Sequence, residues 1–227
     1  MEIVAPSFET VIVTYQRDFE KLQLCLESIV NHGLGHGNET VHVIVNDYVP
    51  AWYHVKEFVP DDTRFCVHPY YHLGPWDGAL DWYSQQWFKL TASKIVSSDW
   101  YLILDSDDLL TRPITHADLF TNNRAHYKKT PVGTDTRLVT QLSAAYNHWN
   151  DTLDNWCYFM TDLTPFVMHT STVKQMLHDI DPGLFDQHSD RLTAEFLLWS
   201  AYLDRHRLKD QLYYPVENLK NCFVNAR

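Results

Sequence analysis

The sequence has few cysteines, and they lie far apart. Its 227 residues include only Cys25, Cys66, Cys157 and Cys222, with no C-x-x-C spacing. This pattern argues against a structural zinc site or a disulfide framework, and it fits reduced thiols in a cytoplasmic protein. The 13 histidines form no H-E-x-x-H pattern, so that zinc hydrolase motif is missing as well.

Long apolar runs and clustered positive charge are also missing. No run reaches the length of a transmembrane segment, and residues 1–16 lack the basic and apolar regions of a secretion signal. The net charge is −11 and the lysines and arginines are scattered, so we expect no extended nucleic-acid-binding surface. The sequence contains neither an internal repeat nor a low-complexity tract, which argues against a solenoid or a disordered chain.

Aromatic residues, in contrast, are abundant. They make up 14% of the sequence, with 8 tryptophans and 13 tyrosines. Such rings fill cores, but they also stack on sugar faces and nucleobases, so the surplus alone leaves both uses open. The apolar share of 45% and the charged share of 21% are typical of a globular protein, and the length fits a single α/β domain over residues 1–227.

The most informative stretch is WYLILDSDDLLTRP, residues 100–113. Residues 100–104 are aromatic or aliphatic without alternation, which predicts a strand buried on both faces of a helix-covered sheet. Asp105, Asp107 and Asp108 follow where the strand leaves the sheet, and crowded carboxylates repel one another unless they share a cation. Oxygen ligands of this kind suit Mn²⁺ or Mg²⁺. The alternative is a turn that caps a helix starting just after the aspartates.

Alternating strands and helices precede this stretch. Apolar and β-branched runs predict strands at 11–14, 41–45, 64–67 and 100–104. Apolar residues at helical spacing predict helices at 19–30, 52–58 and 80–96. This order predicts an α/β fold with a mostly parallel, twisted sheet flanked by helices.

Beyond Pro113 the pattern is looser. Residues 122–136 are polar and basic, and we expect them to form a loop. Further strands are expected at 138–142, 156–160 and 166–168. Helices are expected at 171–180, capped by Thr170 or Ser171, and at 192–206.

This order of elements resembles the GT-A fold glycosyltransferases, which use nucleotide-sugar donors. A first strand and helix, Asp47 after the second strand, another helix and a buried strand ending in D-x-D carry the resemblance. It runs from residue 11 to residue 113, and more loosely through the helix that contains Glu195. Within that group, QQWFKL followed by DWYLILDSDDLLTRP looks like a microbial and viral branch. The resemblance implies a Rossmann-like domain with a nucleotide-sugar-binding half at 1–113 and a smaller acceptor-side half at 114–227.

The resemblance also implies how the donor is bound, with a UDP-sugar as the expected donor. In such enzymes the D-x-D holds Mn²⁺ or Mg²⁺ against the donor diphosphate, because the metal offsets the charge that grows on the leaving nucleotide. The residues that match donor-binding positions are Thr14, Tyr15, Asp47, Lys89, Asp105 and Ser106, and the matching metal ligands are Asp105 and Asp107. Each residue outside the D-x-D has an ordinary alternative as a loop cap or an exposed helix residue.

The resemblance implies fewer residues on the acceptor side. Glu195 matches the position of a general base toward the acceptor hydroxyl, with Asp190 or Asp162 as substitutes. Its alternative role is a first-turn glutamate that complements the helix dipole. His169, or else His188, matches a third metal ligand. The acceptor stays open among a glycan, a lipid-linked sugar, a small molecule, a protein and a modified DNA base.

Three other functions compete with this one. A phosphatase of the haloacid dehalogenase type also has a buried strand ending in D-x-D, with Asp105 as its nucleophile, but it begins with that motif and expects Thr or Val where Leu109 stands. A sugar-phosphate nucleotidyltransferase would need a glycine-rich loop after the first strand, where this chain has Val13-Thr-Tyr-Gln-Arg. A non-catalytic sugar-binding module would account for the aromatic surplus but not for the clustered aspartates.

Overall fold

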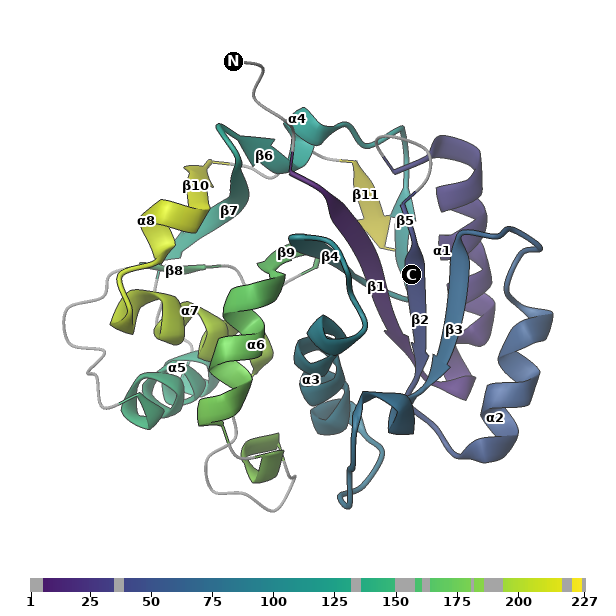
Figure 1. Ribbon diagram of the computed structural model, residues 1–227, viewed down its shortest axis with the longest axis horizontal. Helices are drawn as coiled ribbons and strands as arrows, with labels where there is room; N and C mark the ends of the chain where they lie inside the picture. Colours follow the sequence, from purple (N-terminus) through teal and green to yellow (C-terminus); the bar gives the residue numbers. More distant parts are fainter. Residues whose placement is uncertain are drawn as a thin grey trace.

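The main sheet of the protein has five strands in the order β3-β2-β1-β4-β9 (Figure 1). They are β1 (Phe8–Thr14), β2 (Val41–Val45), β3 (Phe65–Pro69), β4 (Trp100–Asp105) and β9 (Phe166–His169). The computed structural model describes residues 6–34, 39–131, 136–149, 158–160, 164–180, 182–185, 194–217 and 222–225. Strands β1 to β4 run parallel and β9 pairs antiparallel with β4, so the sheet is mixed and mostly parallel, as the sequence predicts.

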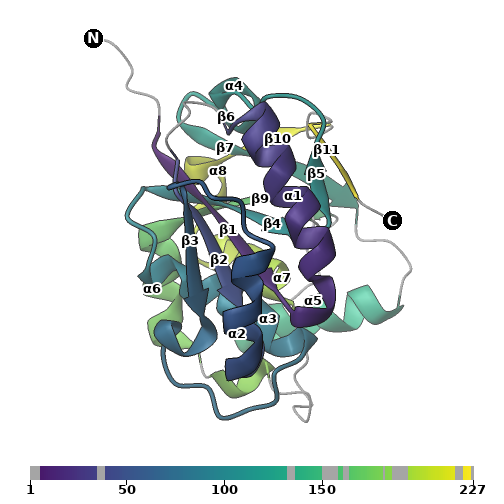
Figure 2. The same ribbon diagram turned by 90° about the vertical axis from the view of Figure 1, so that its right-hand side faces the viewer.

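Helices cover both faces of this sheet. They are α1 (Phe19–His32), α2 (Val49–His54), α3 (Trp82–Thr91), α4 (His116–Leu119), α5 (Thr136–His148), α6 (Thr170–Asp179), α7 (Glu195–Arg205) and α8 (Lys209–Leu212). Helices α3 and α6 lie on one face and α1 lies on the other (Figures 1 and 2). Every residue of β1 is buried, as expected for a strand covered on both sides, and α1 buries one apolar stripe from Phe19 to Ile29. Among the described residues, no helix combines the length and apolar character needed to cross a bilayer.

Two smaller sheets complete the described part of the chain. One contains β6 (Phe120–Thr121), β7 (Arg124–Pro131), β8 (Tyr158–Met160) and β10 (Tyr213–Val216). The other pairs β5 (Asp108–Leu110) with β11 (Phe223–Asn225). The second half of the chain thus adds β9 to the main sheet and β11 beside the acidic stretch, and the buried apolar residues of both halves form one core.

The sequence predictions for the second half are partly wrong. Residues 138–142 lie in α5 and not in a strand, because Leu138, Leu142 and Ala145 recur at helical spacing across a window longer than the five residues considered. Residues 124–131 form β7 and not the expected loop, and the buried Ala125 and Tyr127 of this strand alternate with basic residues. Residues 132–135 of that stretch lie outside the described residues. The acidic stretch continues into β5 and does not start a helix.

Helix caps and turns account for two further differences. The turn between β6 and β7 is Asn122-Asn123, and both residues have positive φ (51° and 62°), which asparagine tolerates in two-residue hairpins. The N-cap of α6 is His169, and neither Thr170 nor Ser171 takes that position. The helix expected at 19–30 is confirmed by α1, and the helix expected at 80–96 is confirmed over α3, which a 3₁₀ turn at residues 92–94 follows.

A row of polar side chains lies on the sheet away from the aspartates. Glu9 of β1 accepts hydrogen bonds from the backbone amides and hydroxyls of Ser97 and Ser98, and it pairs with His42 of β2. The other ring nitrogen of His42 is hydrogen-bonded to His68 of β3 at 3.0 Å. Burial and the neighbouring histidines lower the pKa of His68 to about 4.

This row predicts a loss of stability in mild acid. The unfolded chain binds a proton at His68 near its ordinary pKa of 6.5, but the folded chain binds it only near pH 4. The free energy of unfolding should therefore fall as the pH drops from about 6.5 to 4, before Glu9 begins to contribute below its ordinary pKa of 4.5. In His68→Gln, the free energy of unfolding measured with urea should fall less than in the wild type between pH 7 and pH 4.5. The exposed His54→Gln serves as control, and an unchanged slope in His68→Gln would contradict the assignment.

Candidate functional site

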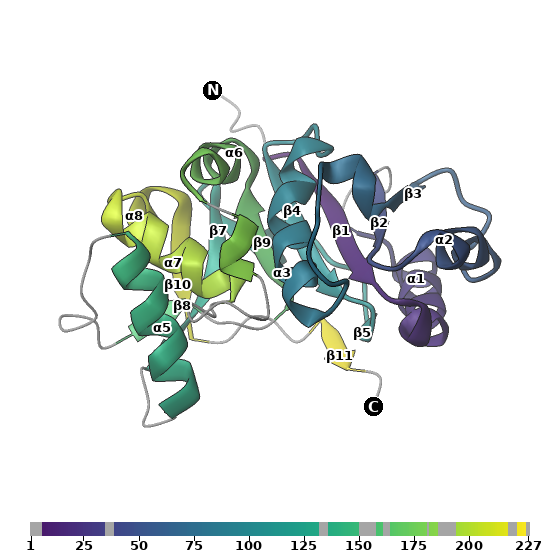
Figure 3. The same ribbon diagram turned by 90° about the horizontal axis from the view of Figure 1, so that it is seen from below.

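A cavity of about 490 Å³ opens at the carboxyl ends of β1 and β4. Ligands of open α/β sheets bind at this edge, and the volume is in the range of small-molecule sites. Figure 3 views the protein from below, the direction toward which β1 and β2 point in Figure 1. The cavity is lined by Tyr15, Arg17, Asp18, Lys21, Trp82, Gln85, Gln86, Lys89, Asp105, Ser106, Asp107, Arg137, Leu138, Gln141, Ala194, Glu195 and Phe196.

Hydrogen bonds connect the amino end of α3 to the loops that follow β1 and β2, at one side of the cavity. Asp81 caps the helix by accepting hydrogen bonds from the amides of Tyr83 and Ser84. The backbone carbonyl of Asp81 in turn accepts hydrogen bonds from the hydroxyl of Tyr15, after β1, and from Nδ2 of Asn46, after β2. The loops after two parallel strands therefore fix where α3 begins and which of its side chains face the cavity.

Lys89 of α3 forms the centre of the site. Its Nζ lies 2.9 Å from Oδ1 of Asp105, at the end of β4, and 3.1 Å from Oε1 of Glu195, at the start of α7. Lys89 is 4% exposed and Glu195 is 1% exposed, so the pair is almost fully desolvated. Burial alone would lower the pKa of Lys89, but the two carboxylates outweigh it and hold this pKa above its ordinary value. Burial also raises the pKa of Glu195, and Lys89 opposes that shift only in part.

The three aspartates of the acidic stretch have different surroundings. Asp108 is 1% exposed and its Oδ2 accepts a hydrogen bond from the amide of Asp105 at 2.9 Å, so it holds the turn. Burial raises the pKa of Asp108 to about 6. Asp105 also accepts a hydrogen bond from Thr164 Oγ1 at 3.1 Å, while Asp107 is partly exposed with its Oδ2 3.7 Å from Nζ of Lys21. Of these three aspartates, Asp105 and Asp107 therefore face the cavity.

Asp105 and Asp107 suit a metal ion whose remaining ligands are phosphate oxygens of a bound substrate and waters. Within the described ranges, no group of three His, Cys, Asp or Glu side chains is arranged to hold a metal ion. Mg²⁺, however, is usually held by one or two carboxylates together with substrate phosphates and waters. Two oxygen-donor side chains beside a cavity of this size match that second arrangement, and they do not match a cage built from protein ligands alone.

Of the other predicted donor-binding residues, some line the cavity and some lie outside it. Tyr15 and Ser106 line the cavity. Thr14 is fully buried with its hydroxyl near the carbonyl of Tyr15, and it does not line the cavity. Asp47 accepts hydrogen bonds from the amides of Gln16 (3.2 Å) and Tyr48 (2.8 Å), which is the loop-capping role that the sequence also allows.

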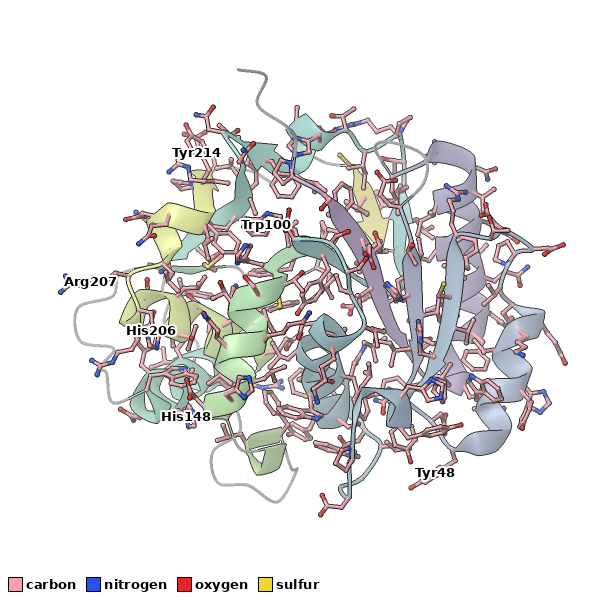
Figure 4. All side chains as sticks on the ribbon, in the orientation of Figure 1. Tyr48, Trp100, His148, His206, Arg207 and Tyr214 are labelled. Carbon is pink, nitrogen blue, oxygen red and sulfur yellow. The ribbon has the colours of Figure 1, made fainter. Side chains whose placement is uncertain are left out.

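The structure does not bring His169 to the aspartates. In the antiparallel pairing of β9 with β4, His169 lies opposite Trp100, the first residue of β4, and their rings are 4.7 Å apart. Asp105 is the last residue of β4, so the length of the strand separates the two. In Figure 4, Trp100 lies in the upper part of the molecule and Tyr48, which follows β2, lies at the bottom. A histidine ligand at position 169 is therefore ruled out by geometry. Asp162, His188 and Asp190 lie outside the described residues.

Sequence reasoning missed several residues of the cavity. Trp82, Gln85 and Gln86 line it together with the predicted Lys89, and the spacing of i, i+3, i+4 and i+7 places all four on one face of α3. Polar residues at this spacing, which core residues usually occupy, could have indicated that this face of α3 lines a cavity. Gln141 of α5 was missed because residues 138–142 were predicted as a strand, and Arg137 lies just before that segment.

Removing Lys89 should destabilise the protein strongly. Lys89→Met leaves the buried carboxylate of Glu195 without its cation, and breaking a buried ion pair from one side costs about 3–5 kcal/mol. Chemical denaturation at pH 7 should show this loss, whereas Lys21→Met, which removes an exposed partner of Asp107, should cost about 1 kcal/mol or less. Adding Glu195→Gln to Lys89→Met should restore part of the stability. A loss below about 1 kcal/mol in Lys89→Met would contradict the pairing.

Comparison of the sequence with known proteins assigns the chain to a family. No curated protein matches the chain. A family model matches residues 6–218, which include β1 to β4, the acidic stretch and α7. The chain therefore belongs to DUF6492, a family of unknown function.

Proposed function

We propose that this protein is a metal-dependent glycosyltransferase of the GT-A type that moves a sugar from a nucleotide-sugar donor to a hydroxyl acceptor. The observation that carries the proposal is the buried contact of Lys89 with both Asp105 and Glu195 at the wall of the cavity. It places a carboxylate of the D-x-D beside a second, desolvated carboxylate. A glycosyl transfer needs both: one group near the departing diphosphate and one near the attacking hydroxyl.

The strand order supports the GT-A assignment. Parallel strands in the order β3-β2-β1-β4 form a Rossmann-like half, and the acidic stretch follows β4 where such sheets bind ligands. The antiparallel β9 continues the same sheet on the far side of β4. The second half of the chain then closes the cavity with α5 and α7, on the side where an acceptor would enter.

The charges in the cavity suit a donor diphosphate. Asp105 and Asp107 would hold Mn²⁺ or Mg²⁺, which when bound offsets the negative charge on the leaving nucleotide. Arg17 and Lys21 line the same cavity and supply positive charge from the β1–α1 loop and the first turns of α1. The cationic group of Lys89 is already paired with two carboxylates, so its role is to orient Asp105 and Glu195. The phosphates would instead be bound by Arg17 and Lys21.

Glu195 is the proposed general base. It is the first residue of α7, it lines the cavity, and burial raises its pKa toward the range in which a carboxylate accepts a proton efficiently. In this role its carboxylate takes the proton of the acceptor hydroxyl as that oxygen attacks the donor sugar. Lys89 keeps the carboxylate in place and favours its ionised form.

Donor binding should depend on Asp107. In a thermal-shift panel of UDP, GDP and their common sugars with and without Mn²⁺, one nucleotide series should raise the melting temperature only when the metal is present. A ligand at 100 times its Kd adds about 2.7 kcal/mol, or about 5–10 °C for a chain of this size. Asp107→Ala should abolish the shift with little effect on the unliganded melting temperature, because Asp107 is partly exposed.

Asp61→Ala, at an exposed position outside the cavity, is the matched control and should keep the full shift. A full metal-dependent shift in Asp107→Ala would contradict the metal assignment. If no nucleotide shifts the wild type and the protein instead releases phosphate from a phosphomonoester, the phosphatase would replace the transferase.

Replacing Glu195 should separate donor binding from turnover. Glu195→Gln keeps the shape of the side chain and leaves Lys89 paired with Asp105, so the fold and the donor affinity should change little. The rate of donor consumption should fall by about 10²–10⁴-fold, the usual contribution of a general base. The rate is measured by the release of nucleoside diphosphate at saturating donor. An unchanged rate in Glu195→Gln would remove the residue from the mechanism.

A further inference from the structure

We infer that Gln85 and Gln86 bind hydroxyl groups of a sugar ring of the donor and so contribute to donor specificity. The inference rests on the proposed function, because it names the part of the donor that meets α3. Both glutamines line the cavity, between Trp82 one turn earlier and Lys89 one turn later. This stripe runs from an exposed aromatic ring to the ion pairs at the D-x-D.

Each glutamine has a fixed amide group. Nε2 of Gln85 donates to the carbonyl of Val13 in β1 at 3.1 Å, and Nε2 of Gln86 donates to the carbonyl of Trp82 at 2.9 Å. No hydrogen bond from the described part of the chain reaches either amide oxygen. The protein therefore orients both side chains through their nitrogen atoms and leaves two acceptor oxygens for another partner.

Gln86 is a buried residue whose amide oxygen stays accessible. The residue is only 2% exposed, yet this oxygen does not belong to the fully buried side-chain atoms that lack a hydrogen-bond partner, so it is open to the cavity. Leucine would fill this position on an ordinary buried helix face. A glutamine here, next to another with the same arrangement, is the pattern of a polar site that faces a ligand.

The chemistry of the pair selects hydroxyl groups. The carboxamides are neutral, so they offer no charge to a phosphate, and their free oxygen atoms accept hydrogen bonds. An amide oxygen repels a phosphate oxygen but accepts a hydrogen bond from an alcohol. Lys89, one turn later on the same face of α3, is already held by Asp105 and Glu195, so this part of the cavity wall favours a neutral polar group.

A nucleotide sugar carries such hydroxyls in two places, on the ribose and on the transferred sugar. Binding of three ligands by titration calorimetry with Mn²⁺ separates them: UDP, 2′-deoxy-UDP and UDP-glucose, or GDP, 2′-deoxy-GDP and GDP-mannose where guanine is the base that binds. The ratio of Kd between the first two measures recognition of the ribose 2′-hydroxyl. The ratio between the diphosphate and its sugar conjugate measures recognition of the transferred sugar.

The variants are Gln85→Leu and Gln86→Leu, with Gln211→Leu as the matched control. Gln211 of α8 makes the same contact as Gln86, because its Nε2 donates to the carbonyl four residues earlier at 2.9 Å, but it lies outside the cavity. In at least one of the two cavity variants, one of the ratios should fall about three- to tenfold toward unity. The affinity for the 2′-deoxy diphosphate should stay within about twofold of wild type in all three variants, which also shows that they are folded.

If both ratios in Gln85→Leu and Gln86→Leu equal those of the wild type, the inference is overturned while the proposed function stands. If the affinity for the 2′-deoxy diphosphate falls by the same factor as that for the other ligands, the glutamines support the fold and do not read hydroxyls, which also overturns it. If the wild type binds none of the six ligands, the proposed function itself fails, and this inference fails with it.

Discussion

The buried ammonium group of Lys89 is the interaction on which the site depends. It joins α3 and β4 to α7, which lies far along the sequence, through two contacts of 2.9 and 3.1 Å. A desolvated carboxylate such as that of Glu195 is tolerated only with a cation beside it, so α7 can dock its first turn against the sheet only where Lys89 stands. The position of one helix relative to the acidic stretch is therefore set by charge as much as by apolar packing.

The rest of the cavity follows from how α3 is fastened at both ends. Its amino end is held by the hydrogen bonds that Tyr15 and Asn46 donate to the Asp81 carbonyl, and its other end by Lys89. Between these points the helix cannot rotate, and one face meets the cavity along its length. The mixed character of that face is consistent with a ligand that is aromatic or hydroxylated at one end and strongly charged at the other.

The first half of the fold could be predicted from the sequence because its signals are local. The buried run before Asp105 and the helical spacing from Phe19 to Ile29 both report what their own residues do. The partners of Lys89 could not be predicted in the same way, because α7 lies more than 100 residues away and its docking depends on tertiary contacts. His169 was misplaced for a related reason: a strand's direction decides which end of the sheet its last residue reaches, and β9 runs opposite to its neighbour.

The pairing of β11 with β5 has a consequence for synthesis. Asp108 is the first residue of β5, and its partner in the register is Asn225. Residues 8–105 contain the four parallel strands and can form that part of the sheet early, but β5 stays without its neighbour until the last described strand has left the ribosome. The strand pairing that follows the turn presenting Asp105 and Asp107 therefore forms only after residues 223–225 have been made, so a nascent chain carries the parallel strands before it carries this pairing.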